Sequence, residues 1–339
     1  MSEKKNLLIF AGAGASVDLG YPTTREFMEH LNHEVINNYI YKPIPKSEKI
    51  DIERVLWFIK AEILEPIENC LIKNDFLHKN CYLFYLNHNP GNNVHSAQEY
   101  YGKAKELTEK INQIVHSSYG VSSIKNQDLR ETGYWVNELI NSGKPSDDHY
   151  NIEIFTTNYD RAIEKALEDN GIPPQRISPF SNSDFNTLLN TDKYSTKKAF
   201  SRKIWLTKLH GSLEWRLTEN GEIEKVIEEF SDKSSVLYPG FKGAPKEKPF
   251  KQFHEYFTAC LQKCDAFLSM GFSYRDEHIN DLIKNNLKPQ SEIYIIDTDP
   301  DGILDKEIWR SWENPQNIKA TRNNIDYSSV YAAKQYLRD

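Results

Sequence analysis

Four segments of the 339-residue chain place glycine, asparagine, aspartate, histidine or serine directly after apolar runs. The first, Gly12 to Ser16, follows the run Leu7 to Phe10 and precedes a predicted helix. Small residues at a strand-to-helix turn let a ligand approach the backbone, whose N–H groups can bind an anion. Such a turn opens dinucleotide sites, although Gly-x-Gly after a strand is often only a tight turn. Val17 stands where hydride-transferring dehydrogenases have a third glycine, so the turn does not favour that class.

Three later segments follow apolar runs in the same way: Thr156 to Asp160, His210-Gly211, and Gly271 to Ser273. With the glycine turn, their order and content resemble the sirtuin family, which carries GAG(I/A)S, T-x-N-x-D, HG and G-(T/F)-S motifs in that order. A looser fifth match, Ile293 to Pro300, lies where sirtuins have a strand that ends in an adenosine-ribose contact. The resemblance covers residues 5–22 and 150–300.

The resemblance implies chemistry at the bond between nicotinamide and ribose of NAD, which breaks through a cation-like sugar as in glycoside hydrolysis. It makes His210 the general base, and Asn158 the group that holds a ribose hydroxyl or the attacking water. Asp160 is expected to point elsewhere and to fix the loop or orient the ribose end of the site. Each residue also has a structural interpretation. His210 could be a structural histidine, Asn158 could cap the helix that starts near Tyr159, and Asp160 could be an acidic residue in the first turn of that helix.

The resemblance also implies a set of dinucleotide-binding residues. They are Gly12, Ala13, Gly14, Ala15, Ser16, Thr23, Gly271, Phe272, Ser273 and Asp297. Asp297 would accept hydrogen bonds from ribose hydroxyls and repel a 2′-phosphate, which favours NAD over NADP. Ser273 could instead start a helix, for which Asp276 is the expected cap.

The chain departs from deacylating sirtuins on the side that binds the acylated peptide. Those enzymes hold a structural zinc ion with two C-x-x-C pairs, whereas this chain has none. Cys260 and Cys264 stand at helical spacing, and Cys70 and Cys81 lie far away, so we predict no zinc and interpret the thiols as buried small apolar groups. The acyl-lysine clamp, V-x-F-G-E, has no clear match, because Val236 to Gly240 occupies that stretch and contains a proline.

This combination looks like the zinc-less sirtuin-like domains of bacterial anti-phage defence systems, which hydrolyse NAD when infection triggers them. The resemblance implies an NAD glycohydrolase that releases nicotinamide and ADP-ribose. It also implies a homo-oligomer, or a separate partner that senses infection, such as a DNA-translocating ATPase. Two alternatives stay open: an NAD-dependent protein deacylase or ADP-ribosyltransferase, and a non-catalytic module that senses NAD or a related nucleotide.

Composition is that of an ordinary globular protein, with 39% apolar and 27% charged residues. No apolar run approaches the ~20 residues of a membrane span, and the strand expected near the N-terminus leaves no room for a signal peptide. The four cysteines have no disulfide-framework spacing, so a cytoplasmic protein is predicted. The net charge of −7 argues against a broad nucleic-acid surface, and we expect no sequence-specific nucleic-acid binding.

These residues must be positioned by strands and helices that alternate along the chain. That alternation predicts an α/β fold, a doubly wound Rossmann-like parallel sheet with a helical insertion module. The core is predicted to comprise 1–22 and 151–339, and the module 23–150. Predicted strands cover 152–156, 204–208, 235–238, 266–270, 292–297 and 318–323. Predicted helices cover 159–169, 250–264, 276–286 and 328–337 in the core, and 51–64, 97–116 and 129–141 in the module. A capping box, Thr23-x-x-Glu26, predicts a further helix through about residue 36. The module is either a packing layer, a lid or an oligomer surface.

Overall fold

The computed structural model describes residues 5–23, 26–27, 97–119, 150–169, 205–217, 223–225, 234–236, 245, 250–323 and 327–338. Most of the predicted module therefore lies outside the described residues, including the helices expected at 51–64 and 129–141 and most of the one after the capping box. Cys70 and Cys81 lie outside them as well.

A six-stranded parallel sheet forms the centre of the described structure. In sheet order its strands are β3 (Trp205–Lys208), β2 (Tyr150–Thr156), β1 (Lys5–Ala11), β7 (Ala266–Met270), β8 (Glu292–Asp297) and β9 (Ile318–Arg322). Counted along the chain among themselves, these strands run 3-2-1-4-5-6, which is the order of dinucleotide-binding sheets. The predicted α/β class and doubly wound parallel sheet are therefore confirmed.

The order of the strands reverses between β1 and β7, which pair in parallel from Leu7 with Ala266 to Ala11 with Met270. In open α/β sheets, ligands bind outside the carboxyl ends of the strands at such a reversal. The turns that follow Ala11 and Met270 therefore flank the expected ligand crevice.

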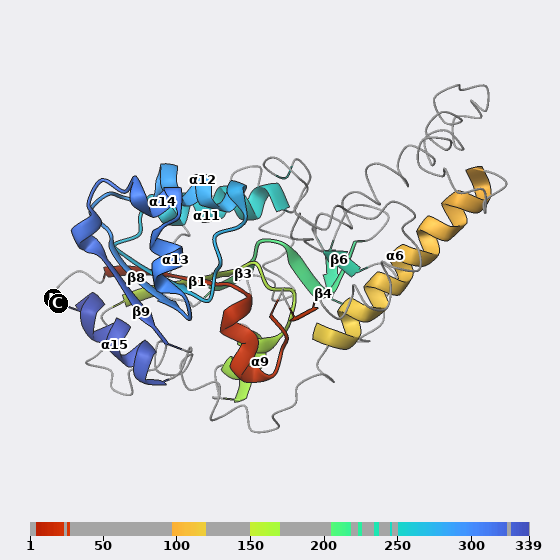
Figure 1. The fold of residues 1–339 in the computed structure, drawn as a ribbon, viewed down its shortest axis with the longest axis horizontal. Coiled ribbons are helices and arrows are strands. Elements are labelled where there is room, and N and C mark those ends of the chain that lie inside the picture. Colours follow the sequence, from red (N-terminus) through yellow and green to blue (C-terminus); the bar gives the residue numbers. More distant parts are fainter. Residues whose placement is uncertain are drawn as a thin grey trace.

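Helices cover both faces of the sheet (Figure 1). On one face lie α11 (Phe250–Leu261), α12 (Glu277–Asn286), α13 (Pro300–Leu304) and α14 (Glu307–Arg310), and on the other lie α9 (Ala162–Asp169) and α15 (Tyr327–Arg338). Side chains of β1 alternate between the two cores. Phe10 packs on Phe257 of α11, with ring centroids 5.3 Å apart, whereas Ile9 belongs to the core that includes Ile163 of α9. Burial on both faces explains why the strands read as continuous apolar runs.

Most predicted core elements are confirmed near their expected bounds. β7 and β8 match their predicted ranges, and α12 and α15 differ from theirs by one residue at one or both ends. α9 begins at Ala162 rather than residue 159, because residues 157–161 form a loop that places Asn158 and Asp160. α11 ends at Leu261, three residues early.

A second, three-stranded antiparallel sheet was not predicted. It consists of β5 (Ile223–Lys225), β4 (Gly211–Leu217) and β6 (Ser234–Val236), in that order. Only Leu209 and His210 separate β3 from β4, and a parallel crossover needs a dozen or more residues. The prediction that the strand at 235–238 joins the main sheet is therefore wrong, since β6 pairs with β4.

The described part of the predicted module is dominated by α6 (Ala97–Tyr119), which confirms the helix expected at 97–116 and extends it. Figure 1 shows α6 reaching beyond the sheet. At its C-terminal end, Tyr119 stacks on Tyr21 with ring centroids 6.4 Å apart, and its ring centroid lies 5.1 Å from that of Phe27. This contact joins the helix to the segment after the glycine turn. Among the described helices, none is long and apolar enough to cross a membrane.

Candidate functional site

The glycine turn after β1 packs backbone to backbone against the turn after β7. The N–H of Gly12 donates to the carbonyl of Met270 at 2.9 Å, and that of Gly14 donates to the carbonyl of Gly271 at 3.0 Å. A Cβ atom on Gly12 would lie 2.5 Å from the Gly271 oxygen. Gly271 has a φ of +57°, and a Cβ there would lie 2.5 Å from the Cα of Gly14. The close approach of the two turns therefore requires glycine at these positions.

These contacts narrow the set of anion donors that the sequence predicts. The N–H groups of Gly12 and Gly14 donate to the neighbouring turn, and that of Ala15 donates to the carbonyl of Gly12 at 2.9 Å. Within the described structure, the N–H groups of Ala13, Phe272 and Ser273 make no hydrogen bond. Phe272 is buried, whereas Ala13 and the exposed Ser273 flank the strand reversal and remain as backbone donors for a ligand.

Asn158 joins the end of β2 to the glycine turn. Its side-chain Nδ2 donates to the carbonyl of Gly12 at 2.8 Å and to Oγ of Ser16 at 3.0 Å. Both amide hydrogens are thus used inside the protein, which leaves Oδ1 as the atom that could contact a ligand or water. The alternative that Asn158 caps a helix is wrong, because α9 begins at Ala162 and the N–H of that residue donates to Asp160.

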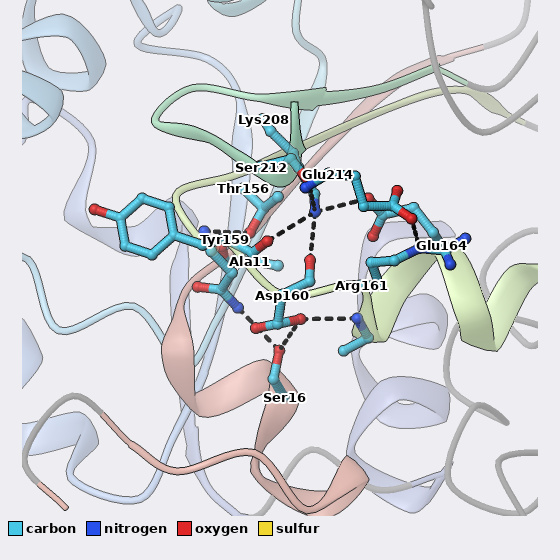
Figure 2. A network of polar contacts seen from close by, with 12 residues as sticks. Ala11, Ser16, Thr156, Tyr159, Asp160, Arg161, Glu164, Lys208, Ser212 and Glu214 are labelled. Carbon is cyan, nitrogen blue, oxygen red and sulfur yellow. Dashed lines mark hydrogen bonds and ion pairs between the residues drawn. The ribbon is translucent and has the colours of Figure 1, made fainter. Parts of the chain in front are cut away.

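Asp160 lies at the centre of a buried polar network (Figure 2). Its Oδ1 accepts from the hydroxyl of Ser16 at 3.2 Å and from the N–H of Ala162 at 2.8 Å. Asn158 and Asp160 therefore converge on the same hydroxyl, which corrects the expectation that Asp160 points elsewhere. Burial raises the pKa of Asp160, and the nearby charge of Lys208 opposes that shift. The contacts suit the expected loop-fixing role.

Lys208 is a buried cation that the sequence did not single out. Figure 2 shows its ammonium group above the Asp160 loop. Nζ donates to the backbone carbonyls of Tyr159, at 3.3 Å, and of Asp160. It also contacts Oγ of Ser212 at 3.2 Å and Oε1 of Glu164 at 2.7 Å. The signal that could have found it is a lysine inside an otherwise apolar strand, because a buried charge must be paired.

His210 follows β3 and lies beside the start of α12. It is 2% exposed, and the next residue, Gly211, turns the chain with a φ of +90°. Nε2 of His210 lies 3.3 Å from Oδ2 of Asp276. Asp276 also caps α12, as predicted, by accepting the N–H of Ile279 at 3.1 Å. The pairing of Asp276 with His210 was not predicted.

Two further histidines line up behind His210. The ring of His254, on α11, lies 6.4 Å from that of His210 and 5.0 Å from that of His278, on α12. Nδ1 of His254 and Nε2 of His278 are 3.0 Å apart. Burial lowers the pKa of His254 to about 3, with the charges of His210 and His278 acting in the same direction. His254 stands four residues after Phe250 and three before Phe257, so helical spacing could have placed it on the buried face.

A family model described as a SIR2-like domain matches residues 152–321, which is half of the chain. The chain belongs to the SIR2-like family. The matched part of the SIR2-like domain contains Asn158, His210 and Gly271, and the glycine turn after β1 precedes it. The sequence-based identification of the family is thus confirmed.

Solved structures similar to this SIR2-like chain include a Sir2 homologue in complex with NAD. The two chains are 12% identical, with a TM-score of 0.46, and the match covers 99% of this chain and 91% of the other. A Sir2 homologue variant bound to 2′-O-acetyl ADP-ribose is 13% identical, with a TM-score of 0.44 and coverage of 99% and 94%. A structure of Sir2Tm with a propionylated peptide is 10% identical, with a TM-score of 0.43 and coverage of 99% and 93%. No curated protein is significantly similar to the chain in sequence.

The turn after β7 of the SIR2-like domain is fixed by aromatic packing. Phe272 is buried between Phe10 and Tyr274, with ring centroids 4.7 Å from each. Tyr274 has a φ of +53°, which costs a bulky residue roughly 1–3 kcal/mol. Its hydroxyl donates to Oγ of Ser269 at 2.7 Å. This packing holds the intervening Ser273 exposed beside the reversal.

Two predicted binding residues lie outside these turns: Thr23 follows the glycine turn in sequence, and Asp297 ends a neighbouring strand. Thr23 forms the predicted capping box: its Oγ1 accepts the N–H of Glu26 at 3.2 Å, and its own N–H donates to the Glu26 carboxylate at 2.8 Å. Asp297 ends β8, one strand beyond β7, and its Oδ1 accepts the N–H of Asp299 at 2.8 Å. Burial raises the pKa of Asp297. Both residues remain predictions as ligand contacts.

The two cysteines of the SIR2-like core are buried, as the sequence predicted. Cys260 and Cys264 are free and 0% exposed, and the Sγ of Cys264 donates to the carbonyl of Ala266 at 2.8 Å. In the described ranges, no cluster of histidine, cysteine and acidic side chains could hold a metal ion.

Proposed function

We propose that this SIR2-like chain binds NAD at the strand reversal and hydrolyses it to nicotinamide and ADP-ribose. The observation that carries the proposal is the contact of Asn158 with Gly12, which brings an uncharged polar side chain from the end of β2 to the glycine turn. His210 follows the next strand of the sheet, β3. Because the carboxyl ends of parallel strands meet at one edge, all four sequence motifs lie at the same edge of the sheet.

The residues at this edge fit a dinucleotide. The glycines let the two turns pack against each other at the strand reversal. Beside them, the N–H groups of Ala13 and Ser273 would bind the oxygens of a pyrophosphate. Asp297, at the end of β8, would accept hydrogen bonds from the adenosine ribose. Its carboxylate disfavours a 2′-phosphate, so we propose NAD rather than NADP.

The reaction breaks the bond between the nicotinamide nitrogen and C1′ of the ribose, and nicotinamide leaves with the bonding electron pair. The oxygen of water forms the new bond to C1′, and its released proton goes to His210 acting as general base. Oδ1 of Asn158 would hold the water or a ribose hydroxyl. Asp160 and Lys208 would act by fixing the loop that carries Asn158.

The proposal includes no zinc-supported binding site for an acylated peptide. The sequence has no C-x-x-C pair, and Cys260 and Cys264 are packed in the core, where burial raises the pKa of both thiols. A thiol that stays protonated is a poor zinc ligand. Elemental analysis of protein purified without a metal-affinity tag should find no stoichiometric zinc. One zinc ion per chain would favour a deacylase instead.

We further propose that the enzyme is cytoplasmic and that its depletion of NAD serves anti-phage defence. A hydrolase that destroys NAD must stay inactive until needed. We therefore propose that activity requires a homo-oligomer, or a separate sensor such as a DNA-translocating ATPase, and that the module at 23–150 makes the oligomer contacts. The contact of Tyr119 with Tyr21 ties α6 to the segment after the glycine turn, so assembly through the module would be able to affect the site.

The test is to incubate the full chain, at concentrations that span its assembly, with NAD alone and with NAD plus an acetylated peptide. Nicotinamide and ADP-ribose in equal amounts from NAD alone would support the proposal. Nicotinamide that appears only with the peptide, together with its deacetylation, would show a deacylase. An assembled chain that binds NAD without turnover would show a sensing module.

A further inference from the structure

His210 and Asp276 come from elements far apart in the sequence and meet at one buried position. Their side chains are 3% and 15% exposed, and Nε2 of His210 lies 3.3 Å from Oδ2 of Asp276. An ionised carboxylate only accepts hydrogen bonds, so Nε2 of a neutral His210 must carry the hydrogen. The basic lone pair of the imidazole is then on Nδ1.

We propose that Asp276 is the positioning residue of the catalytic base: it holds His210 in the tautomer that presents Nδ1 as proton acceptor, and its charge stabilises the imidazolium that forms. The inference rests on the proposed function, because it assigns the partner of the base in that reaction. The same logic operates where a buried carboxylate orients a catalytic histidine and remains ionised.

The surroundings of His210 make Asp276 the charged partner. Burial raises the pKa of Asp276, but three interactions lower it by more: the hydrogen bond to His210, the charge of His210 when it is protonated, and the N–H of Ile279. The pKa of Asp276 therefore lies below its ordinary value. On the other elements packed against His210, the pKa values of His254 and His278 are lowered, chiefly by burial, which favours neutral rings. The aromatic ring of Tyr159 lies 6.5 Å away.

His254 and His278 also have a defined hydrogen-bond direction. Nε2 of His254 lies 3.4 Å from the carbonyl of Leu209, which only accepts, so this nitrogen carries the hydrogen. Nδ1 of His254 then accepts from Nε2–H of His278 at 3.0 Å. The neutral pair therefore packs beside His210 and leaves the ion pairing to Asp276.

Variants of Asp276 separate positioning from capping, because Asp276 does both. Serine and asparagine are good N-cap residues and would retain the bond to Ile279, but neither carries the charge. Glu277, exposed in the first turn of the same helix, provides a matched control for loss of a carboxylate there. The series is Asp276→Ser, Asp276→Asn and Glu277→Gln in the full chain.

The inference predicts that Asp276→Ser and Asp276→Asn lower kcat for NAD at least about tenfold, within the ~10²–10⁴ that a general base supplies. KM should change less than about threefold, because Asp276 makes no proposed contact with NAD. Glu277→Gln should match the wild type. A kcat within about twofold of wild type in either Asp276 variant would overturn the inference.

Histidine tautomers provide a readout that does not need turnover. In long-range proton–nitrogen spectra of ¹⁵N-histidine-labelled protein, the His210 signal is assigned by its loss in His210→Asn. The inference predicts an Nε2–H tautomer in the wild type and loss of that single state in Asp276→Ser. An Nδ1–H tautomer in the wild type would overturn it. If the wild type cleaves no NAD, the proposed function fails, and this spectrum still decides the pairing.

Discussion

The side-chain amide of Asn158 donates to the backbone carbonyl of Gly12 at 2.8 Å, across 146 positions of sequence. The N–H of Gly12 also donates to the carbonyl of Met270, so Gly12 links the carboxyl ends of β2, β1 and β7. The site is therefore built on strand ends whose mutual positions are fixed by the sheet. Substitutions that disturb these links should change both stability and turnover.

Gly271→Ala should destabilise the fold by at least about 2 kcal/mol, because alanine at a positive φ is strained and its Cβ would lie 2.5 Å from the Cα of Gly14. Gly102→Ala, inside α6, should instead stabilise by about 0.5–1 kcal/mol, because the new Cβ would meet no atom within 4 Å beyond its chain neighbours and the backbone of its own helix. Thermal melting of both variants checks the pair. A Gly271→Ala protein that melts with the wild type would show that the two turns can separate at little cost.

Lys208→Met should destabilise the chain by about 3–5 kcal/mol, because it leaves the Glu164 carboxylate and two backbone carbonyls without their buried cation. The control is Lys284→Met, which removes a surface pair with Glu307 and should cost about 0–1 kcal/mol. Urea unfolding measures both. Adding Glu164→Gln to Lys208→Met should restore part of the loss. Equal costs for the two lysines would contradict the role of Lys208 in fixing the Asp160 loop.

The stability of the fold should fall as the solution is acidified from pH 7 to pH 5. The pKa of His254 is about 3 in the folded chain, against about 6.5 when unfolded, so the unfolded state binds more protons in this range. His254 alone should account for a loss of about 2 kcal/mol at pH 5. His254→Gln, which stays neutral, should show a flatter profile by that amount. Parallel profiles for the two proteins would mean that His254 is protonated in the fold.

The sequence predicts those parts of the fold that depend on continuous apolar runs. β7 and β8 coincide with apolar runs, and β8 extends one acidic residue beyond its run at each end, because strands buried on both faces carry little polar alternation. The cap of α12 by Asp276 was also predictable, since capping is local in sequence. The missed strand β4 carried a usable signal, with buried Leu213 and Trp215 on either side of the less buried Glu214.

Contacts between distant segments could not be predicted in the same way. The second partner of Asp276 is His210, and that pairing depends on how the loop after β3 meets the start of α12 in space. The role of Lys208 likewise depends on tertiary contacts, because its ammonium group donates to the backbone carbonyls of Tyr159 and Asp160. The sequence predicted too many phosphate donors, because the N–H groups of Gly12 and Gly14 donate to the neighbouring turn instead. Local patterns give candidate residues, and tertiary contacts decide which atoms remain for a ligand.

The most direct measurement is nicotinamide release from NAD by the assembled full chain, compared with His210→Ala and Asn158→Ala at matched melting temperatures. The account predicts equimolar nicotinamide and ADP-ribose from the wild type without any peptide, and a rate lower by ~10²–10⁴ in His210→Ala. Asn158→Ala should also lose turnover, because it removes both the Oδ1 atom and the link to Gly12. An assembled wild type that leaves NAD intact, or a His210→Ala protein that retains the wild-type rate, would contradict the central claim.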